Sequence, residues 1–443
     1  MTKQHVDAGP FGQALSAEAK KLVNEVRLQI NQPINPFFDK DFNIYRFVLN
    51  AERAYKTQKE TVQQAAKALN NHLRLRKCLR LDELPDIPFA DNPIFKAKYL
   101  PWGEIQRKTD SSNRLLQYVE YKTITVEYIA HSLKSSDSCR FQFWQFEHIL
   151  RRVNEQEEKS GKFCSVRHIV DMNDYEINPF TMLFVSSGTL QYYSHLFHYE
   201  NYPELVYPVE MVNIAKWIYL PYKIIKSVMP AGFADRFRLY DGHFLPNLEN
   251  EIDIEDIPET LGGKNKEIKC TSAVAPSEEE KWHCHVPQIV NALETLVIHS
   301  RKVKYYKVEV TEAPTTLSWY FHTDSDIYFG VFYEQKDSNN NKKKEKDEID
   351  TDALEMVYPM FKLTAKLVHE YDSIECTQPG FYYLVFGNKH SWMHKRTVEL
   401  MVQVRTQDNE LRRLHQDGTY QKITDEELDI EKKMALTPFK TNI

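Results

Sequence analysis

The first part of the chain carries apolar residues at the spacing of amphipathic helices. In the ranges 41–54 and 58–79 they recur three and four positions apart, as in Ile44, Phe47 and Val48. This spacing places them on one face of an α-helix. Proline at positions 85 and 88 then ends the helical pattern. We therefore expect residues 1–86 to form an N-terminal all-α module.

The pattern changes near Leu115, where short apolar runs alternate with longer amphipathic stretches. Strands are predicted at LLQYVEY (115–121), FCSVRHIVDM (163–172), ELVYPVEMVNI (204–214) and RFRLYD (236–241), and helices at 141–159, 180–199 and 217–228. Alternation of this kind is typical of a sheet whose strands are joined by helices that cover it. Residues 90–266 are thus expected to form an α/β domain with a mixed, mainly parallel sheet.

The sequence pattern of the last third of the chain is typical of an all-β domain. Strands are predicted at KYYKVEV, TLSWYFHT, DIYFGVFYE, GFYYLVFG and TVELMVQV, with turn residues between them. We expect a β-sandwich over residues 271–406. Residues 335–355 form a polar, charge-rich insert that predicts a mobile loop, and residues 407–443 form a polar tail without a clear period.

Composition narrows the classes of function. A chain of 443 residues, 42% of them hydrophobic, is long enough for two or three packed domains. The net charge of −6 argues against a nucleic-acid partner. No segment has the ~20 uninterrupted apolar residues of a membrane helix, so we expect a cytoplasmic protein. Six cysteines without a CxxC pair favour reduced thiols over disulfides.

The Gly262-Gly263 pair lies in IEDIPETLGGKNK, within a chain that has only 13 glycines. The glycine pair has three possible interpretations, which are a phosphate-binding loop, a hairpin turn and a crowded turn that closes one domain. Neither GxxxxGK[ST] nor GxGxxG occurs in the chain. The pair follows the helix-like PNLENEI and precedes a change in composition, so a closing turn is the simplest interpretation.

Two regions of the chain resemble known families. NYPELVYPVEMVNI, the stretch from Trp217 that ends in MP, RFRLYD and EDIPETLGGK resemble the CRAL-TRIO lipid-binding domain of phosphatidylinositol/phosphatidylcholine transfer proteins. The helical region around Arg46-Phe47 resembles that family's N-terminal module, and the order of the pieces agrees over about residues 41–266. SWYFHTDSDIYFGVFYE and PGFYYLVFGNKHSW resemble a GOLD domain, a β-sandwich found in trafficking proteins.

The resemblance implies a lipid held in an apolar cavity beneath a mobile gate helix, here residues 217–229, in which Pro221 would introduce a kink. Burial of acyl chains is favourable because each exposed CH2 group costs about 0.8 kcal/mol. Lysines at positions 216, 223 and 226 would reach lipid phosphates. The lipid-binding residues that the resemblance implies are Glu204, Trp217, Ile218, Tyr222, Ile225, Met229 and Arg236.

We accordingly expect a cytoplasmic lipid-binding or lipid-exchange protein that associates peripherally with membranes. Its partners would be a hydrophobic lipid, a transient membrane surface and a protein bound through the GOLD domain. The alternative is a trafficking or signalling scaffold that does not transfer lipid and whose lipid pocket has degenerated. An open apolar cavity beneath residues 217–229 would favour the first function, and a cavity filled by aromatic side chains the second.

The chain departs from the family at the headgroup positions. Glu204 matches the glutamate that follows the family's Tyr-Pro step, but the threonine and lysine positions fall on Gly232 and Asp235. The hydroxyl positions that hold phosphocholine fall on or near residues 176 and 178. An aspartate repels a phosphate where a lysine would attract it. We expect a lipid other than phosphatidylinositol, or weak binding of phosphatidylinositol, unless Arg236 or Arg238 compensates.

Other candidate chemistry is weaker. His283 and His285 of WHCHV share one face of an extended segment, with Cys284 opposite and Cys270 upstream, but two side chains on one face do not make a zinc site. His168 shares a strand face with valines and is interpreted as a hydrogen-bonded core histidine. No GxSxG, HExxH or Cys/His nucleophile signature occurs. We expect no catalysis, no metal and no cofactor.

Overall fold

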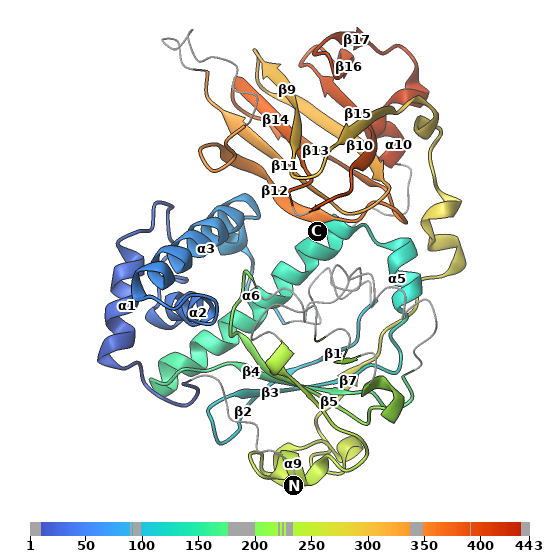
Figure 1. Cartoon of the computed structure of the whole chain (residues 1–443). Helices are drawn as coiled ribbons and strands as arrows, with labels where there is room; N and C mark the ends of the chain where they lie inside the picture. Colours follow the sequence, from blue (N-terminus) through green and yellow to red (C-terminus); the bar gives the residue numbers. More distant parts are fainter. Residues whose placement is uncertain are drawn as a thin grey trace. The chain divides into compact units, whose positions relative to one another are not determined.

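The computed structural model describes residues 10–88, 91, 99–175, 200–219, 222–223, 226, 234–336, 349–389 and 391–435. The chain divides into two compact units. Unit 1 comprises Met1–Arg76, Leu81–Val126 and Phe141–Ala275, and unit 2 comprises Lys77–Arg80, Glu127–Arg140 and Pro276–Ile443. Figure 1 shows the elements of both units with their labels.

Unit 1 begins with the helical region that the sequence predicts. The helices are α1 (Ala17–Arg27), α2 (Asp41–Glu52) and α3 (Gln58–Cys78). Ser16 caps α1 by accepting a hydrogen bond from the backbone N–H of Ala19 at 3.1 Å. The apolar positions of α2 and α3 are buried, including Ile44, Val48 and Leu69, so the helical periodicity is confirmed.

A five-stranded mixed sheet forms the centre of unit 1. Its order is β2-β3-β4-β5-β6, in which β2 and β3 are antiparallel and the other neighbours are parallel. The strands are β2 (Ile105–Thr109), β3 (Leu115–Glu120), β4 (Val166–Asp171), β5 (Val206–Val212) and β6 (Phe237–Leu239). Strands β1 (Trp102–Gly103) and β7 (Cys270–Thr271) form a separate antiparallel pair that contacts β3, where Gln117 donates to the carbonyl of Gly103. Strands β3, β4, β5 and β6 fall within the predicted segments, whereas β2 was not predicted. The parallel pairing of β3 to β6 agrees with the expected α/β domain.

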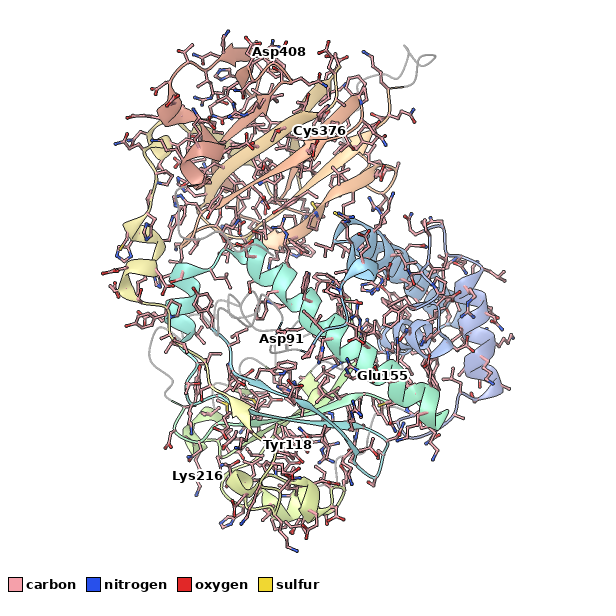
Figure 2. The ribbon with its side chains drawn as sticks, turned by 180° about the vertical axis from the view of Figure 1, so that it is seen from behind. Asp91, Tyr118, Glu155, Lys216, Cys376 and Asp408 are labelled. Atoms are coloured by element: carbon pink, nitrogen blue, oxygen red, sulfur yellow. The ribbon has the colours of Figure 1, made fainter. Side chains whose placement is uncertain are left out.

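Helices lie on both faces of this sheet. Figure 1 shows the long helix α6 (Ser135–Ser160) on one side and the short helix α9 (Leu245–Glu249) on the other. On the α9 side, a core forms from Leu116, Tyr118 and Ile169 of the sheet and Leu248 of α9. Figure 2 shows Tyr118 on the sheet. The helix predicted at 180–199 lies outside the described residues.

The paired glycines form a tight turn near the end of unit 1, which continues to Ala275. Gly262 has a φ of 85° at the end of the 3₁₀ helix η8 (Glu259–Leu261), a conformation that favours glycine. A Cβ atom on Gly263 would lie 2.1 Å from the carbonyl oxygen of Ile257. The N–H of Gly263 donates to the carbonyl of Pro258 at 3.1 Å. The backbone therefore requires both glycines, in agreement with a closing turn.

Unit 2 is β-rich and built from two antiparallel sheets. One has the order β12-β11-β14-β9, and the other has the order β13-β10-β15-β16-β17 with β8 also paired to β15. Their strands are β8 (Glu294–Ile298), β9 (Val303–Val310), β10 (Thr315–Thr323), β11 (Ile327–Glu334), β12 (Glu355–Leu363), β13 (Glu370–Cys376), β14 (Gly380–Gly387), β15 (Arg396–Arg405), β16 (Leu411–Leu414) and β17 (Tyr420–Lys422). Aromatic side chains of both sheets meet in one core, because Trp319 lies 5.3 Å from Phe329 and Phe321 lies 5.4 Å from Phe386 between ring centroids. Cys376, labelled in Figure 2, is buried at the end of β13.

Unit 2 also contains segments that the sequence pattern does not assign to a sandwich. Strands β16 and β17 and helix α10 (Ile430–Ala435) come from the polar segment after Gln407, and Ile430 and Met434 pack with the buried Trp282. The segment Glu127–Arg140 also belongs to unit 2 and includes most of helix α5 (Val126–Ser132). Most of the insert expected at 335–355 lies outside the described residues.

Candidate functional site

The structure brings two of the sequence-predicted site residues into direct contact. Arg236, at the end of the 3₁₀ helix η6 (Ala234–Arg236), donates through Nη2 to Oε1 of Glu204 at 2.5 Å. Glu204 lies just before β5, is fully buried and has a left-handed φ of 57°. Such a φ is uncommon for a residue with a side chain. Arg236 is buried as well.

The other predicted site residues belong to the proposed gate segment 217–229. Ile218 ends the 3₁₀ helix η5 (Lys216–Ile218), and Tyr222 is helical and half-buried. The hydroxyl of Tyr222 donates to the carbonyl of Ala234 at 3.1 Å, two residues before Arg236. Ile225, Met229 and the side chain of Trp217 lie outside the described residues.

Helix α2 supplies two further arginines to Glu204. Arg53 follows the last residue of α2, and its Nη1 lies 2.7 Å from Oε1 of Glu204. Arg46 donates through Nη1 to the backbone carbonyl of Glu204 at 3.3 Å. The two arginines are seven residues apart, which is two helical turns, so they lie on the same face of α2. This spacing is the sequence signal that would have added Arg53 to the predicted site.

Glu157 of α6 completes the arrangement on the other side of Arg46. Its Oε1 accepts from Arg46 Nη2 at 2.5 Å and from the backbone N–H of Cys164 at 2.9 Å. Burial raises the pKa of Glu157 from 4.5 to about 7, although Arg46 and the Cys164 N–H act in the opposite direction. We call Arg46, Arg53, Glu157, Glu204 and Arg236 the Glu204 cluster.

The Glu204 cluster carries more positive than negative charge. It contains three guanidinium groups and two carboxylates, and protonation of Glu157 near neutral pH would raise the excess further. Oε2 of Glu204 and Oε2 of Glu157 are both buried and accept no hydrogen bond from any described residue. Arg46 and Arg236 are buried, whereas the Arg53 side chain is 18% exposed, so the buried arginines equal the two carboxylates in number. Three guanidinium groups in one place nevertheless offer N–H donors to an anionic group.

Aromatic packing fixes the position of Arg46. Phe11, Phe163 and Tyr207 form a buried core, with ring centroids of Phe11 5.2 Å from Phe163 and 5.1 Å from Tyr207. The guanidinium of Arg46 lies over the Phe163 ring at 4.5 Å. Backbone hydrogen bonds from Gly12 to Phe163 and from Phe163 to Gln13 hold the N-terminal segment here. The cluster is thus held between α2, α6 and the segments that precede β4 and β5.

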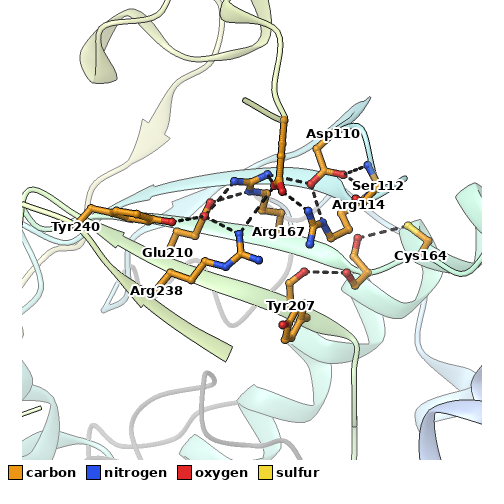
Figure 3. Close-up of polar contacts among 11 residues, drawn as sticks. Asp110, Ser112, Arg114, Cys164, Arg167, Tyr207, Glu210, Arg238 and Tyr240 are labelled. Atoms are coloured by element: carbon orange, nitrogen blue, oxygen red, sulfur yellow. Dashed lines mark hydrogen bonds and ion pairs between the residues drawn. The ribbon is translucent and has the colours of Figure 1, made fainter. Parts of the chain in front are cut away.

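A second buried charge network lies on the opposite face of the sheet (Figure 3). Arg167 donates through Nε to Glu210 at 2.7 Å and through Nη1 to Asp110 at 3.1 Å. Arg238 contacts Glu210 at 3.3 Å, and Glu251 pairs with the network as well. With Arg114 included, three arginines face three carboxylates. The charges balance, so this network serves the fold and has no need of an anionic ligand.

The residue-by-residue comparison with the family places Asp235 at the headgroup site, but in the structure its side chain does not face the Glu204 cluster. Its carboxylate lies 3.5 Å from Nζ of Lys226, and the side chain is 66% exposed. Arg236 takes the place next to Glu204 instead. Arg238, the other candidate, belongs to the opposite network. Gly232 and residues 176 and 178 lie outside the described residues.

One pocket in unit 1 is formed entirely by described residues and has a volume of about 470 Å³. It lies between α6 and the segments around Phe37 and Leu84. Asp82, Asp86 and Glu155 line it, and Figure 2 labels Glu155 on α6. A wall with these carboxylates is unsuited to acyl chains. Residues 220–221, 224–225 and 227–229, which belong to the segment above the expected apolar cavity, lie outside the described part of the chain, so the cavity stays a prediction.

The remaining candidates have structural explanations. His168 is buried, and its Nδ1 lies 2.8 Å from Oε1 of Gln117, as expected for a hydrogen-bonded core histidine. Within the described part of the chain, no group of three or more His, Cys, Asp or Glu side chains is placed to hold a metal ion. All six cysteines are free thiols. No helix among the described residues is long and apolar enough to cross a membrane.

Comparison with known families assigns three consecutive regions. Residues 102–263 match the CRAL/TRIO domain, residues 15–84 match a domain of unknown function (DUF8435), and residues 284–412 match the F28H7_8_C-like, C-terminal domain. The chain therefore contains a CRAL-TRIO domain, followed by a C-terminal β-rich domain that relatives with a CRAL-TRIO domain share. These three models do not include a GOLD domain, so the GOLD assignment of the β-rich domain stays a prediction.

Two curated proteins and one solved structure align with this chain along most of their own length. The CRAL-TRIO domain-containing protein F28H7.8 of Caenorhabditis elegans is 24% identical over 398 residues, which cover 89% of this chain and 92% of the relative. Protein ctg-1 of the same organism is 20% identical over 350 residues, which cover 77% of this chain and 87% of ctg-1. The crystal structure of Sfh5 aligns with a TM-score of 0.39 and 14% identity, covering 60% of this chain and 96% of Sfh5.

Proposed function

We propose that this protein binds a phospholipid in its CRAL-TRIO domain and exchanges it between membranes, with the headgroup phosphate held at the Glu204 cluster. The observation that carries the proposal is the convergence of Arg46, Arg53 and Arg236 on Glu204. The CRAL-TRIO family is generally one of lipid binders, which supports a lipid as the ligand. A phosphate on that lipid would accept hydrogen bonds from these guanidinium groups.

The chemistry of arginine supports a phosphate in particular. A guanidinium group presents a planar set of N–H donors that matches two oxygens of one phosphate, and it stays charged at every physiological pH. Glu204 would orient Arg53 and Arg236 by accepting from both through a single oxygen. Under this proposal Arg236 would provide the cation that Asp235 could not supply. The sequence argument for weak binding of phosphatidylinositol would then lose its basis at this position.

The remaining parts of the proposal come from the sequence resemblance. Trp217, Ile218, Tyr222, Ile225 and Met229 would form the apolar gate over the acyl chains. The hydrogen bond from Tyr222 to Ala234 supports a connection between this segment and Arg236. We propose that unit 2 is a GOLD-type sandwich, which two antiparallel sheets with a shared aromatic core support. The proposed function is binding without chemical conversion, in the cytoplasm and at membrane surfaces.

A vesicle transfer assay tests this function. Donor vesicles would carry fluorescent phosphatidylcholine or phosphatidylinositol, and acceptor vesicles would carry none. The purified protein should accelerate transfer of at least one of the two lipids above the spontaneous rate. If it accelerates neither and extracts no other phospholipid from mixed vesicles, the exchange function is wrong and the scaffold alternative replaces it.

A further inference from the structure

Unit 2 carries an exposed apolar tip at the end of its sandwich. The tip consists of the turn 299–304 between β8 and β9 and the loop 388–396 between β14 and β15, with residue 390 outside the described part. Trp392 is 78% exposed and Met393 is 83% exposed. Among the described residues, no other two consecutive large apolar side chains are both exposed. Such a pair in water requires an explanation.

The base of the tip is held rigidly by Asn388, which is buried. Its backbone N–H donates to Lys302 at 2.9 Å and its carbonyl accepts from Arg301 at 3.0 Å. Its side-chain amide donates to the carbonyl groups of Ile298 at 3.1 Å and His394 at 2.9 Å. One buried amide therefore joins the two loops, and the apolar residues project from a fixed platform.

Arg301 and Ser300 hold Trp392 in its exposed position. Ser300 donates through Oγ to the carbonyl of Trp392 at 3.1 Å, and the Arg301 guanidinium lies over the indole ring at 4.3 Å. Arg301 itself has a left-handed φ of 62°. The turn conformation of Arg301 and its two contacts therefore keep the Trp392 side chain on the surface.

The tip is strongly basic around its apolar centre. The ranges 299–304 and 388–396 contain no Asp or Glu. They contain six basic residues, which are Arg301, Lys302, Lys304, Lys389, Lys395 and Arg396. Arg301, Lys389 and Lys395 form no ion pair with a carboxylate of the described chain. The chain as a whole has a net charge of −6, so this concentration of positive charge is local.

We infer that this tip is a membrane-docking site that inserts Trp392 and Met393 into the interface of a bilayer rich in anionic phospholipids. Tryptophan favours the headgroup level of a bilayer, because its ring is apolar and its N–H is polar. Lysine and arginine beside it are attracted to anionic headgroups. A projecting apolar pair matches a bilayer, which deforms around it, whereas a protein partner would need a pocket of the same shape. The inference concerns unit 2 alone and does not rest on the lipid pocket of unit 1.

Vesicle sedimentation tests the inference with matched variants. The native protein should bind vesicles of phosphatidylcholine with phosphatidylserine, and bind pure phosphatidylcholine vesicles more weakly. The double variant Trp392→Ala/Met393→Ala should lose about tenfold in vesicle affinity, because the buried apolar area is removed. Leu28→Ala, at a site 86% exposed in unit 1, is the control and should bind like the native protein.

Charge variants test the basic residues in the same assay. The variant Lys389→Glu/Lys395→Glu should abolish the preference for vesicles with phosphatidylserine. The control variant Lys56→Glu/Lys67→Glu changes the net charge by the same amount at exposed sites in the helical region, and it should keep this preference. Native-like vesicle binding by the Trp392/Met393 variant would overturn the inference. The inference would also be overturned if the native protein bound an acidic protein but did not bind vesicles. The lipid that each variant carries after purification is measured separately. An intact lipid content with lost vesicle binding separates this inference from the proposed pocket.

Discussion

The guanidinium of Arg236 lies 2.5 Å from the carboxylate of Glu204, although 32 residues separate them along the chain. The same carboxylate oxygen accepts from Arg53 at 2.7 Å. One buried carboxylate therefore holds two guanidinium groups in place through a single oxygen. This relationship supports the proposal that an anionic headgroup binds at the amino ends of the parallel strands.

Replacing Arg236 should reduce the phospholipid that the protein carries. Arg236→Ala removes one charge-assisted contact, which is worth about 1.5–3 kcal/mol, or roughly ten- to a hundredfold in lipid affinity. The matched control is Arg238→Ala, which removes an arginine of the balanced network on the opposite sheet face. Phospholipid phosphate per mole of protein is the readout. Equal lipid loss in both variants would mean that general destabilisation, and not the Glu204 cluster, sets the lipid content.

The raised pKa of Glu157 predicts a pH-dependent contribution to stability. Its folded-state pKa of about 7 lies above the ordinary 4.5, so the folded chain binds this proton more tightly than the unfolded chain. The resulting stabilisation is complete below about pH 4.5 and is lost as the pH rises through about 7.

Glu157→Gln tests this contribution with little change in contacts. The amide oxygen can keep the bonds that Oε1 accepts from Arg46 and Cys164, and the amide nitrogen takes the place of the unpartnered Oε2. Urea unfolding of both proteins at about pH 5 and about pH 8 measures the effect. The free energy of unfolding of the variant, relative to that of the native protein, should be higher at about pH 8 than at about pH 5. A constant difference would show that Glu157 titrates near its ordinary pKa.

Glu370 should hold the segment Glu127–Arg140 within unit 2. Its carboxylate accepts from Ser135 Oγ at 2.7 Å and from the Ser136 backbone N–H at 3.0 Å, at the start of α6. Arg140 pairs with Asp372 at 2.7 Å beside it. Because all these groups lie in a buried or half-buried network, Glu370→Ala should destabilise unit 2 by about 3 kcal/mol.

Hydrogen exchange locates the effect of Glu370→Ala. Amides of residues 131–140 should exchange faster in the variant, since Ser136 loses its acceptor. Glu399→Ala, which removes a half-exposed carboxylate of the neighbouring β15, should leave their exchange unchanged. If the segment 131–140 keeps native protection in the Glu370 variant, the carboxylate does not hold it in place.

The closing turn gives a sharp test of backbone geometry. Gly263→Ala would place a methyl group against the Ile257 carbonyl and should lower the free energy of unfolding by at least about 2 kcal/mol. Gly242→Ala is the control, because a Cβ there meets no atom within 4 Å. Thermal unfolding compares the two. Equal melting temperatures would show that the turn relaxes without cost.

Sequence periodicity was sufficient to predict the elements that bury a continuous apolar face. Helices α2 and α3, strands β3, β4 and β5 and, in unit 2, strands β9, β10, β11, β14 and β15 were predicted because each repeats apolar residues at its own period. Strands β8, β12 and β13 of unit 2 were not predicted. Strand β17 was missed because all three of its residues are exposed and only its pairing with β16 defines it. Helix α10 was missed because only Ile430 and Met434 of its residues are buried.

The candidate site was predictable only in part, for a different reason. Glu204 and Arg236 followed from the family resemblance, but Arg53 and Glu157 join them through contacts between distant segments. The network of Arg167, Glu210 and Asp110 likewise draws its partners from segments up to 100 residues apart along the chain. Local periodicity contains no information on which buried charges meet across a sheet.

Native mass spectrometry of the purified chain tests the central claim most directly. The protein would be measured as isolated and again after incubation with mixed phospholipid vesicles. Our account predicts the chain mass plus one phospholipid, at a roughly one-to-one ratio typical of an enclosed ligand site, and a larger loss of this species in Arg236→Ala than in Arg238→Ala. The lipid released from the complex would be identified by its fragments. Unliganded chain alone in both measurements would contradict the account.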